Sequence, residues 1–481
     1  MPSRSRLLLI ASPTGTVYGD YKRLYRKGFL NPPIHLGYIA ASVEKAGHEA
    51  RILDGDAEML DVAEIVALAG EYRPDLIGIT ATSIDFEIAK DIARALKSEY
   101  PEIPVIIGGT HINIFGNQVL ATSPDIDFGC LGDGEDLIVE LLEVLKDKDS
   151  KGLQSIQGLI YRDDGEIIQN PDRTIVKDID KYPFPARHLL KNELYYRAVP
   201  WDGYRTTTAF MSSRGCPFNC VYCAVKNITG GKIVRLRSAE DVVDELDYIV
   251  NKMNITHISF NDDCLTLNKT RIYDICEGIR KRGLRFTWEG LSRADLVDGH
   301  LLKTMRQAGF VRISYGIESG NPVVLKALNK EETLEQIQDA FRLTKEAGIV
   351  ARGSLIIGSP HETRETVMES FRFIRRLKGL DQVVINIMQP YPGTKVREMF
   401  LRGEGGTRFL SDPEHLEKLR RFGSASISVN DLSPKSLVFF QKLGFLMFYL
   451  RPGALLNNLR IAGGKTFLQD GLGFMRSILG V

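Results

Sequence analysis

Short apolar runs alternate with helical patterns along most of this chain, and this alternation restricts the fold more than any other feature of the sequence. Continuous apolar runs are typical of strands that are buried on both faces, and a helix between two such strands makes them parallel. The alternation occurs in two series, which a stretch of different character separates. With 481 residues, the chain is long enough for more than one hydrophobic core. The sequence therefore predicts a multidomain α/β protein.

The first series occupies residues 1–150. We expect strands at Leu7–Ala11, Ala50–Leu53, Leu76–Thr80, Val105–Ile107 and Ile126–Cys130. Helices are expected at Ile34–Ala46, Val62–Glu71, Phe86–Ser98 and Asp136–Leu145. This order predicts a flavodoxin-like, doubly wound domain, whose ligand binds beyond the carboxyl ends of the strands. The candidate ligand-binding loops are Ser12–Pro33, Ala81–Asp85 and Gly108–Asn113.

Residues 151–200 interrupt the alternation and are expected to form a connector, with a hairpin turn at Asp163–Gly165 and a proline-containing stretch at Tyr182–Pro185. The second series covers residues 201–394. Its expected strands are Thr207–Ser212, His257–Phe260, Phe286–Trp288, Arg312–Ile317, Gly353–Ile357 and Gln382–Met388. These units predict a partial (β/α)6 barrel, since a closed barrel of eight units typically takes about 250 residues. Catalytic groups are expected at the carboxyl ends of its strands.

The last region, residues 395–481, is rich in Phe and Leu and is expected to be mostly helical, with a break at Pro452–Gly453. One interpretation is a helix that packs on the barrel. The other is an interfacial helix that makes peripheral contact with a membrane, because an apolar surface with cations beside it suits an anionic lipid surface. The cations that favour this second interpretation are Arg421, Lys435, Lys442, Arg451 and Arg460.

Charge and cysteine content narrow the class of protein. The chain carries 62 Lys and Arg residues against 61 Asp and Glu residues, so no overall charge favours nucleic acid, and a small or apolar substrate is expected. The apolar run Leu7–Ala11 is too short for a signal peptide, and no apolar run reaches the length of a membrane span. Six cysteines in so long a chain do not form a disulfide framework. A cytoplasmic, metal-binding protein is expected.

Three of the cysteines are packed closely together. Cys216, Cys220 and Cys223 are spaced C-x3-C-x2-C directly after an expected strand of the barrel. A cubane with three protein thiolates has one open iron, which suits a cluster that binds a substrate, whereas an electron-transfer cluster generally has four thiolates. The alternative is a structural zinc site, which needs a fourth ligand, with Cys130, Cys264 and Cys276 as candidates.

This motif, with the aromatic Tyr222 just before the last cysteine, resembles that of the radical S-adenosylmethionine (SAM) superfamily. The downstream phrases resemble its cobalamin-dependent subclass, which has a B12-binding domain. These phrases are Phe260–Asp263, Arg293–Asp295, Tyr315–Gly320 and Ile356–Pro360. The resemblance implies a [4Fe–4S] cluster on the three cysteines, SAM at the open iron, and a 5′-deoxyadenosyl radical made by one-electron cleavage of SAM.

The resemblance also implies which residues contact SAM. Tyr222 would lie against the adenine, and Arg293 and Glu318 would meet the carboxylate and the ribose or amino end. Gly358 would let the backbone approach a flat ring. Without the resemblance, an Arg and a Glu at strand ends would more often be a structural ion pair.

Three further residues at the end of one expected strand are candidates for the site. Asp262 or Asp263 would orient SAM or take a proton, although a carboxylate at such a corner commonly caps the next helix. Cys264 is expected to be a buried free thiol. We assign no general acid or base.

The N-terminal domain resembles the cobalamin-binding domains of the same subclass. The phrases that carry this resemblance are Asn31–Pro33 with Leu36–Gly37, Glu44–His48, Gly108–His111 and Gly132–Glu135. It implies that the residues which contact cobalamin are Gly108, Gly109, His111, Gly132, Gly134 and Glu135. The Asp-x-His-x-x-Gly motif, whose His ligates cobalt in many cobalamin enzymes, is absent from the loop after Leu7–Ala11. We therefore expect His111 to bind the corrin periphery or to cap a helix, and not to ligate cobalt. The alternative is a domain of this fold that serves for docking, without cobalamin.

Together, these cofactors predict a methyltransferase that acts on an unactivated carbon of a hydrophobic substrate such as a lipid, an isoprenoid or a tetrapyrrole. One alternative, which relatives of this architecture suggest, is an anaerobic oxidative cyclase of a magnesium porphyrin. The alternative of another class is an iron–sulfur or cobalamin sensor. For the enzyme, the expected partners are a small molecule and an electron donor such as flavodoxin or ferredoxin.

Overall fold

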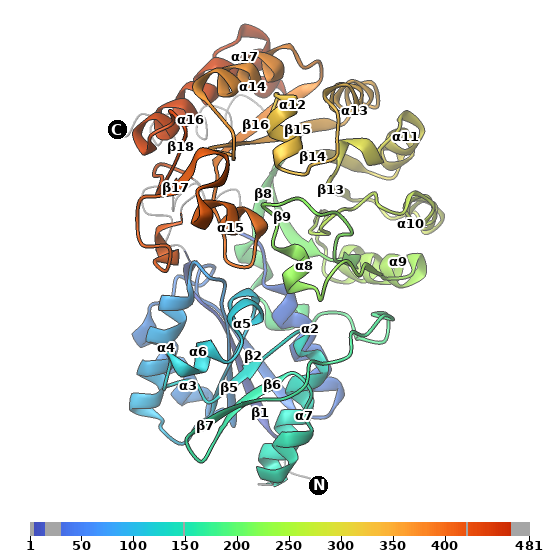
Figure 1. Ribbon diagram of the computed structural model, residues 1–481. Coiled ribbons are helices and arrows are strands. Elements are labelled where there is room, and N and C mark those ends of the chain that lie inside the picture. The colour runs from blue at the N-terminus through green and yellow to red at the C-terminus, as the bar shows by residue number, and fades with distance from the viewer. Residues whose placement is uncertain (1–3, 15–29, 148–149, 420–421, 463–481) are drawn as a thin grey trace. The chain divides into compact units, whose positions relative to one another are not determined.

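The computed structural model describes residues 4–14, 30–147, 150–419 and 422–462 (Figure 1). Part of the expected loop Ser12–Pro33, residues 15–29, lies outside this set, as does Arg421. The chain divides into two compact units. Met1–Tyr195 with Asn227–Gly231 form one, and Tyr196–Lys226 with Lys232–Val481 form the other.

The first unit contains the predicted doubly wound sheet. Its order is β2-β1-β3-β4-β5-β6-β7, and β1 to β5 are parallel. These five strands are β1 (Arg6–Ala11), β2 (Glu49–Asp54), β3 (Leu76–Thr80), β4 (Val105–Gly108) and β5 (Phe128–Cys130). The helices are α2 (Ile34–Lys45), α3 (Val62–Tyr72), α4 (Phe86–Glu99), α5 (Thr110–Phe115), α6 (Gln118–Ala121) and α7 (Gly134–Asp147). The flavodoxin-like fold is therefore confirmed.

The run Leu7–Ala11 of β1 is apolar because its residues face two cores. Leu7 and Leu9 belong to a core cluster that includes residues of α2 and α7, whereas Leu8 and Ile10 belong to a second cluster with residues of α3 and α4. Successive side chains of a strand point to opposite faces, so a sheet that helices cover on both sides needs apolar residues at every position.

The predicted hairpin at Asp163–Gly165 forms, with β6 (Leu159–Asp163) antiparallel to β7 (Glu166–Gln169). It does not stand apart as a connector, because β6 also pairs antiparallel with β5 and so extends the first sheet. Tyr161 is 1% exposed in one core cluster of this unit, and its neighbour Ile160 is buried in the other. Burial of its apolar side chains on both faces therefore stabilises the hairpin as part of the sheet.

The second unit contains an open sheet in the order β16-β15-β14-β13-β12-β9-β8. Its strands are β8 (Tyr196–Val199), β9 (Gly203–Phe210), β12 (His257–Phe260), β13 (Thr287–Ser292), β14 (Phe310–Glu318), β15 (Val350–Ile357) and β16 (Leu380–Ile387). The strands from β9 to β16 are parallel, and β8 pairs antiparallel with β9. The end strands β8 and β16 do not pair with each other, so the predicted partial barrel is confirmed.

Helices follow the parallel strands and are arranged along one side of the sheet (Figure 1). They are α9 (Ala239–Asp247), α10 (Lys269–Lys281), α11 (Gly299–Gln307), α13 (Leu334–Glu346) and α14 (Arg364–Arg376). The chain also forms two short helices, α8 (Val225–Ile228) and α12 (Pro322–Ala327). Ser238, Asn268, Asp298 and Thr333 each accept a backbone N–H in the first turn of one of the longer helices. These caps satisfy donors that a helix start leaves unpaired.

The C-terminal region is mostly helical, as predicted, with α15 (Lys395–Arg402), α16 (Pro434–Tyr449) and α17 (Pro452–Ala462). It also contains the short antiparallel pair β17 (Thr407–Phe409) and β18 (Ile427–Val429). None of the described helices is long and apolar enough to cross a membrane.

Helix α16 covers the outer edge strand of the open sheet. Gln441 Nε2 donates to the Ile385 carbonyl at 2.7 Å, and the Tyr449 hydroxyl donates to the Val383 carbonyl at 3.1 Å. An uncovered edge would leave such backbone groups open to another chain. The interpretation of a helix packed on the barrel therefore holds for α16.

Candidate active site

The three motif cysteines lie on one loop of the second unit, between β10 (Ser213–Arg214) and α8, just beyond the carboxyl end of β9. All three are free and partly buried. Burial raises the pKa of the Cys216 thiol, and it raises the pKa of Cys223 to about 11. Bound iron reverses this preference, because the cation stabilises the thiolate. Three thiols on a loop at a strand end fit a cluster with three protein ligands.

Two buried carboxylates hold the start of this loop. Asp262 is 0% exposed and accepts from the Ser212 backbone at 2.8 Å and from the hydroxyls of Ser212 and Ser213 at 2.5 Å. Asp263 accepts from the Gly215 backbone at 2.9 Å. Neither carboxylate caps the following helix, because Asn268 is the N-cap of α10. These residues position the cysteine loop, a role that the sequence did not indicate.

The rest of the loop is held by backbone contacts from later segments. Val221 N–H donates to the Leu328 carbonyl at 3.0 Å, and the Val221 carbonyl accepts from Val396 N–H at 2.9 Å. The Asn329 side chain donates to the Asn219 carbonyl at 3.0 Å. The loop therefore depends on the segment after α12 and on the start of α15, more than 100 residues along the chain in each case.

The arrangement does not support a zinc site. Within the described ranges, no three or more His, Cys, Asp and Glu side chains gather in a way that would hold a metal ion. A single ion needs its ligands to converge on one point. A four-iron cluster binds each thiolate through a different iron, so its ligands need not converge. Cys130, Cys264 and Cys276 are free and buried, and burial raises the pKa of each thiol to about 11 or 12.

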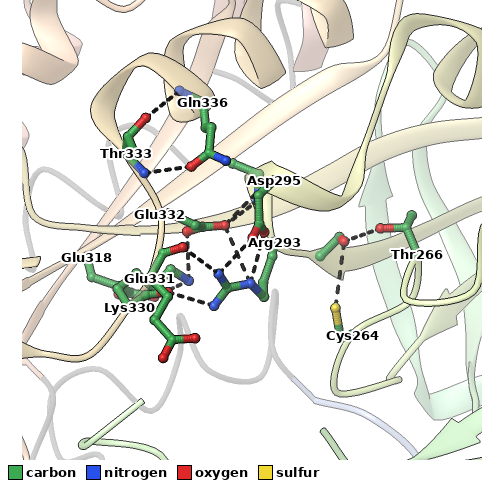
Figure 2. A network of polar contacts seen from close by, with 12 residues as sticks. Cys264, Thr266, Arg293, Asp295, Glu318, Lys330, Glu331, Glu332, Thr333 and Gln336 are labelled. Carbon is green, nitrogen blue, oxygen red and sulfur yellow. Dashed lines mark hydrogen bonds and ion pairs between the residues drawn. The ribbon is translucent and has the colours of Figure 1, made fainter. Parts of the chain in front are cut away.

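Figure 2 shows the polar network that includes Arg293. Its guanidinium donates from Nε and Nη2 to the two carboxylate oxygens of Asp295, both at 2.9 Å, and from Nη1 to the Lys330 carbonyl at 2.8 Å. It also lies 3.8 Å from the centre of the Phe218 ring, within the cysteine motif. The guanidinium of Arg293 is thus already bound by other residues of the chain, and it links the end of β13 to the cysteine loop. Contact of Arg293 with SAM stays a prediction.

Glu318 lies at the end of β14, at a β-bulge and with a φ of 61°. Its Oε1 accepts from the Tyr222 hydroxyl at 3.0 Å and lies 3.8 Å from Lys330 Nζ. Burial raises the pKa of Glu318, and Lys330 and the Tyr222 hydrogen bond oppose this rise. A Cβ on Gly316 would stand 2.1 Å from Glu318 Oε1 and 3.0 Å from Lys330 Nζ. The glycine therefore leaves room for the carboxylate and its cation.

Lys330 was not predicted from the sequence, although it is nearly fully buried between Glu318 and Glu332, 3.3 Å from a Glu332 carboxylate oxygen. The sequence Asn329-Lys330-Glu331-Glu332 reads as an exposed charged turn, and only the fold brings the lysine to the end of β14.

Gly358 has a φ of 85°, which favours glycine, and its backbone N–H donates to the buried Glu362 at 2.5 Å. A Cβ on Gly358 would meet Ile427 at 3.2 Å and Leu437 at 3.3 Å. Packing against the C-terminal region therefore explains the glycine without a ligand, and its approach to adenine stays a prediction.

In the first unit, Gly108, Gly109 and His111 lie at the carboxyl end of β4. Among the described residues, a Cβ on Gly108 would have only Cys130 near it, at 3.9 Å, whereas one on Gly109 would stand 2.5 Å from the Ala81 carbonyl. Gly109, with a φ of 99°, is therefore a glycine because a side chain there would clash with the loop after β3. Gly108 leaves space at the carboxyl end of the strands.

His111 is buried between two aromatic rings. Its ring centre lies 3.8 Å from that of Phe86 and 4.6 Å from that of Phe115, and its Nδ1 is 3.2 Å from the Ser83 hydroxyl. Burial, with a further contribution from Lys90, lowers the pKa of His111 to about 4, so the imidazole is neutral. Stacking and the Ser83 contact hold this ring in place, which leaves corrin contact as a prediction.

Gly132, Gly134 and Glu135 lie between β5 and the first turn of α7. Gly132 has a φ of 83°, and a Cβ there would meet no atom of the described residues within 4 Å. Its N–H donates at 2.7 Å to Asn113, in the α5 segment after β4, so the two loops are joined. A Cβ on Gly134 would meet Ile39 of α2 at 3.0 Å, and Glu135 is 4% exposed. Space at Gly108 and Gly132, on neighbouring strand ends, fits the approach of a large planar ligand.

The fold and the site define a class of enzyme: a partial barrel with a three-cysteine loop at a strand end, and a doubly wound unit in the same chain. Comparison with known families agrees with this class. Residues 27–142 match the B12 binding domain, and residues 210–374 match the Radical SAM superfamily.

Individual relatives agree as well. An uncharacterised methyltransferase of Pyrococcus horikoshii is 33% identical over 461 residues, which cover 94% of each chain. An anaerobic magnesium-protoporphyrin IX monomethyl ester cyclase of Cereibacter sphaeroides is 29% identical, over 71% of this chain and 56% of the cyclase. The solved structure of the radical SAM methyltransferase TsrM from Kitasatospora setae, with cobalamin and a [4Fe–4S] cluster bound, shares the fold, with a TM-score of 0.71, 17% identity and coverage of 94% and 90%.

The chain belongs to the cobalamin-dependent radical SAM enzyme family. It is a radical SAM enzyme, and its cofactors are a [4Fe–4S] cluster, SAM and cobalamin. The alternative of a sensor protein is therefore not supported.

Proposed function

We propose that this enzyme is a methyltransferase that acts on an unactivated carbon of a hydrophobic small molecule. The full-length similarity to the Pyrococcus horikoshii methyltransferase carries the proposal, because it spans both cofactor-binding segments of the chain. When bound, the cluster with SAM supplies a radical that abstracts hydrogen, and cobalamin supplies the methyl group.

The chain's own residues have distinct roles in this proposal. Cys216, Cys220 and Cys223 bind the cluster. Glu318 offers SAM its second carboxylate oxygen, Oε2, which has no partner among the described residues. Tyr222 donates to Oε1 of the same carboxylate and lies on the cysteine loop, so it fixes Glu318 relative to the cluster.

The contribution of Glu318 can be measured directly. Glu318→Ala is expected to keep the iron and to weaken SAM binding by about 1.5 to 3 kcal/mol, the value of one charge-assisted hydrogen bond. Arg293→Ala is also expected to weaken SAM binding if the Arg293 guanidinium exchanges its hydrogen bonds to Asp295 for hydrogen bonds to the SAM carboxylate. Anaerobic calorimetry with SAM, together with iron content, measures both effects. Unchanged SAM affinity in both variants would show that the two residues are only structural.

A second measurement tests whether a histidine of the protein ligates cobalt. We expect no histidine nitrogen on cobalt, because His111 is held between Phe86 and Phe115. Electron paramagnetic resonance of the cob(II)alamin form should therefore show no nitrogen superhyperfine splitting that depends on His111. A splitting that is present in the wild-type protein and lost in His111→Ala would refute this expectation.

A one-electron donor of the flavodoxin or ferredoxin class completes the proposal, because cleavage of SAM consumes an electron. The substrate is a small molecule, and the inner face of the barrel is where we expect it to bind.

We also propose that the enzyme makes peripheral contact with an anionic membrane. Leu456 on α17 is 67% exposed, and Leu450 just before it is 58% exposed. A surface cavity of about 590 Å³ beside them is lined by Lys345, Lys378, Arg451 and Arg460. Exposed leucines beside cations suit an anionic lipid surface. Sedimentation with vesicles of anionic lipid tests this contact, and equal binding of Leu456→Ser would refute it.

Ring closure is the second candidate function, and the similarity to the magnesium-protoporphyrin cyclase favours it. Mass spectrometry of lipid and pigment extracts, from cells fed methyl-deuterated methionine, separates the two reactions. A product that gains one labelled methyl group only when the active enzyme is present supports methylation. A product that loses hydrogen and carries no label supports ring closure.

A further inference from the structure

The inner face of the partial barrel is lined by small, polar and partly exposed side chains. From Ser314 on β14, Arg352 on β15 and Gln382 on β16 towards the carboxyl ends, partly exposed residues alternate with buried ones. The partly exposed residues are Ser314, Gly316, Arg352, Ser354, Ile356, Gln382, Val384 and Asn386. Closed barrels typically fill this space with bulky branched side chains. The open barrel therefore keeps room for a ligand along its strands.

The strand register places Arg352 deep within this face. Arg352 on β15 pairs in register with Ser314 on β14, and Arg312 and Glu289 pair one layer nearer the amino ends of the strands. Ile356 lies four residues further along β15. At about 3.3 Å per residue, that is a separation of about 13 Å towards the carboxyl ends, where the cysteine loop begins.

The guanidinium of Arg352 has no carboxylate of its own among the described residues, because the neighbouring Glu289 binds two other arginines. Glu289 receives Arg312 Nε at 2.6 Å and Arg197 Nη1 at 2.5 Å, so both of its oxygens are engaged. Within the described ranges, the guanidinium of Arg352 makes two hydrogen bonds, both long, from Nε and Nη2 to Gln382 Oε1 at 3.4 Å. In the described part of the chain, no carboxylate lies within ion-pair distance of its guanidinium.

The protonated state of Arg352 is costly for the free protein. Burial lowers the pKa of Arg352 to about 10; the charge of Arg312 adds to this effect, and the charge of Glu289, which is shared with two other arginines, opposes it. A largely buried cation without an ion-pair partner of its own gains most from an anionic ligand, because that ligand restores what burial removed. A guanidinium also matches a carboxylate or a phosphate with two parallel hydrogen bonds.

We propose that Arg352 binds an anionic group of the substrate, a carboxylate or a phosphate, on the inner face of the barrel. This inference rests on the proposed function and names its substrate class. The substrate is amphipathic: its anionic end meets Arg352 and Ser314, and its apolar part lies along Ile356 and Val384. The reacting carbon is then about 13 Å from the anionic group, because the strand end that faces the cluster is that far from Arg352.

Binding of matched probes to the reconstituted holoenzyme tests the proposal. Decanoate, decyl phosphate, decan-1-ol and decyltrimethylammonium share one tail and differ in charge. At least one anion is expected to bind about tenfold or more tightly than decan-1-ol, and the cation more weakly. The stronger anion shows whether the group is a carboxylate or a phosphate.

Two variants and one control make the result specific. Arg352→Gln removes the cation, and Gln382→Glu places a carboxylate beside an unchanged Arg352. Both are expected to reduce the preference for the anion by about tenfold or more. The control Arg342→Gln removes an exposed arginine of α13, which pairs with Asp339 and Glu346, and should change nothing.

The outcomes separate this inference from the proposed function. Equal affinity for the anions and the alcohol, or an anion preference that persists in Gln382→Glu, would overturn the role of Arg352. If Arg352→Gln loses iron, Gln382→Glu still decides, because it keeps the arginine. The proposed function fails instead if the wild-type holoenzyme forms no 5′-deoxyadenosine from SAM under reduction, whatever the probes show.

Discussion

Replacement of Cys216, Cys220 or Cys223 by alanine is expected to abolish the cluster and, with it, all cleavage of SAM. In the proposed cluster site each cysteine supplies one of three thiolates, so its loss would open a second iron and leave two ligands on the loop. Anaerobically reconstituted wild-type protein should carry about four irons per chain, and the variants far fewer. Iron analysis, the absorption spectrum and the yield of 5′-deoxyadenosine measure the change.

Cys276→Ala is the matched control, because Cys276 is a free thiol that is 0% exposed in the core of the same unit. It should keep the iron. Stoichiometric zinc in the anaerobically purified protein, with no iron spectrum after reconstitution, would contradict the assignment. So would a cluster that survives in all three motif variants.

The fold could be predicted from the sequence because the spacing of apolar residues along each element matches the positions that the fold buries. From Leu7 to Ala11 each residue of β1 faces one of two cores, so this run is apolar, and a sheet with helices on both sides follows. The hairpin of β6 and β7 was predicted as a turn but not as part of the first sheet. Its pairing with β5 depends on which edge is free, and no local pattern contains that information.

The site was only partly predictable. Spacing alone singles out the three motif cysteines, since they lie within eight residues, and their role as ligands of one cluster stays a prediction. Asp262 acts on residues 49 and 50 positions earlier, so its role appears only when β12 and β9 lie side by side. Arg293 was expected to face a ligand, but Asp295, two residues away, already engages its fork.

Glu289→Gln is expected to destabilise the barrel unit by about 3 to 5 kcal/mol, because it leaves two arginines without their shared carboxylate. Arg197 and Arg312 both donate to Glu289, which is 5% exposed. The chain has two tryptophans, Trp201 and Trp288, and both lie in this unit. Urea unfolding followed by tryptophan fluorescence therefore reports on the barrel.

Glu346→Gln is the control for this measurement. Glu346 forms an exposed ion pair with Arg342 on α13, so its loss should change the free energy of unfolding by no more than about 0.5 kcal/mol. If Glu289→Gln unfolds at the same urea concentration as Glu346→Gln, the buried pair does not stabilise the barrel.

The dependence of this stabilisation on pH follows from the same contacts. Burial alone would raise the pKa of Glu289, but Arg312 and Arg197 outweigh burial and hold the pKa well below its usual range. A carboxyl with a lowered folded-state pKa contributes its full stability above its unfolded value, near pH 4.3, and loses it as pH falls through the folded value. The difference between wild type and Glu289→Gln should therefore be constant from about pH 6 to pH 8 and shrink only in stronger acid. A difference that disappears near neutral pH would show that Glu289 is protonated in the folded barrel, and the arginines would then need another counter-charge.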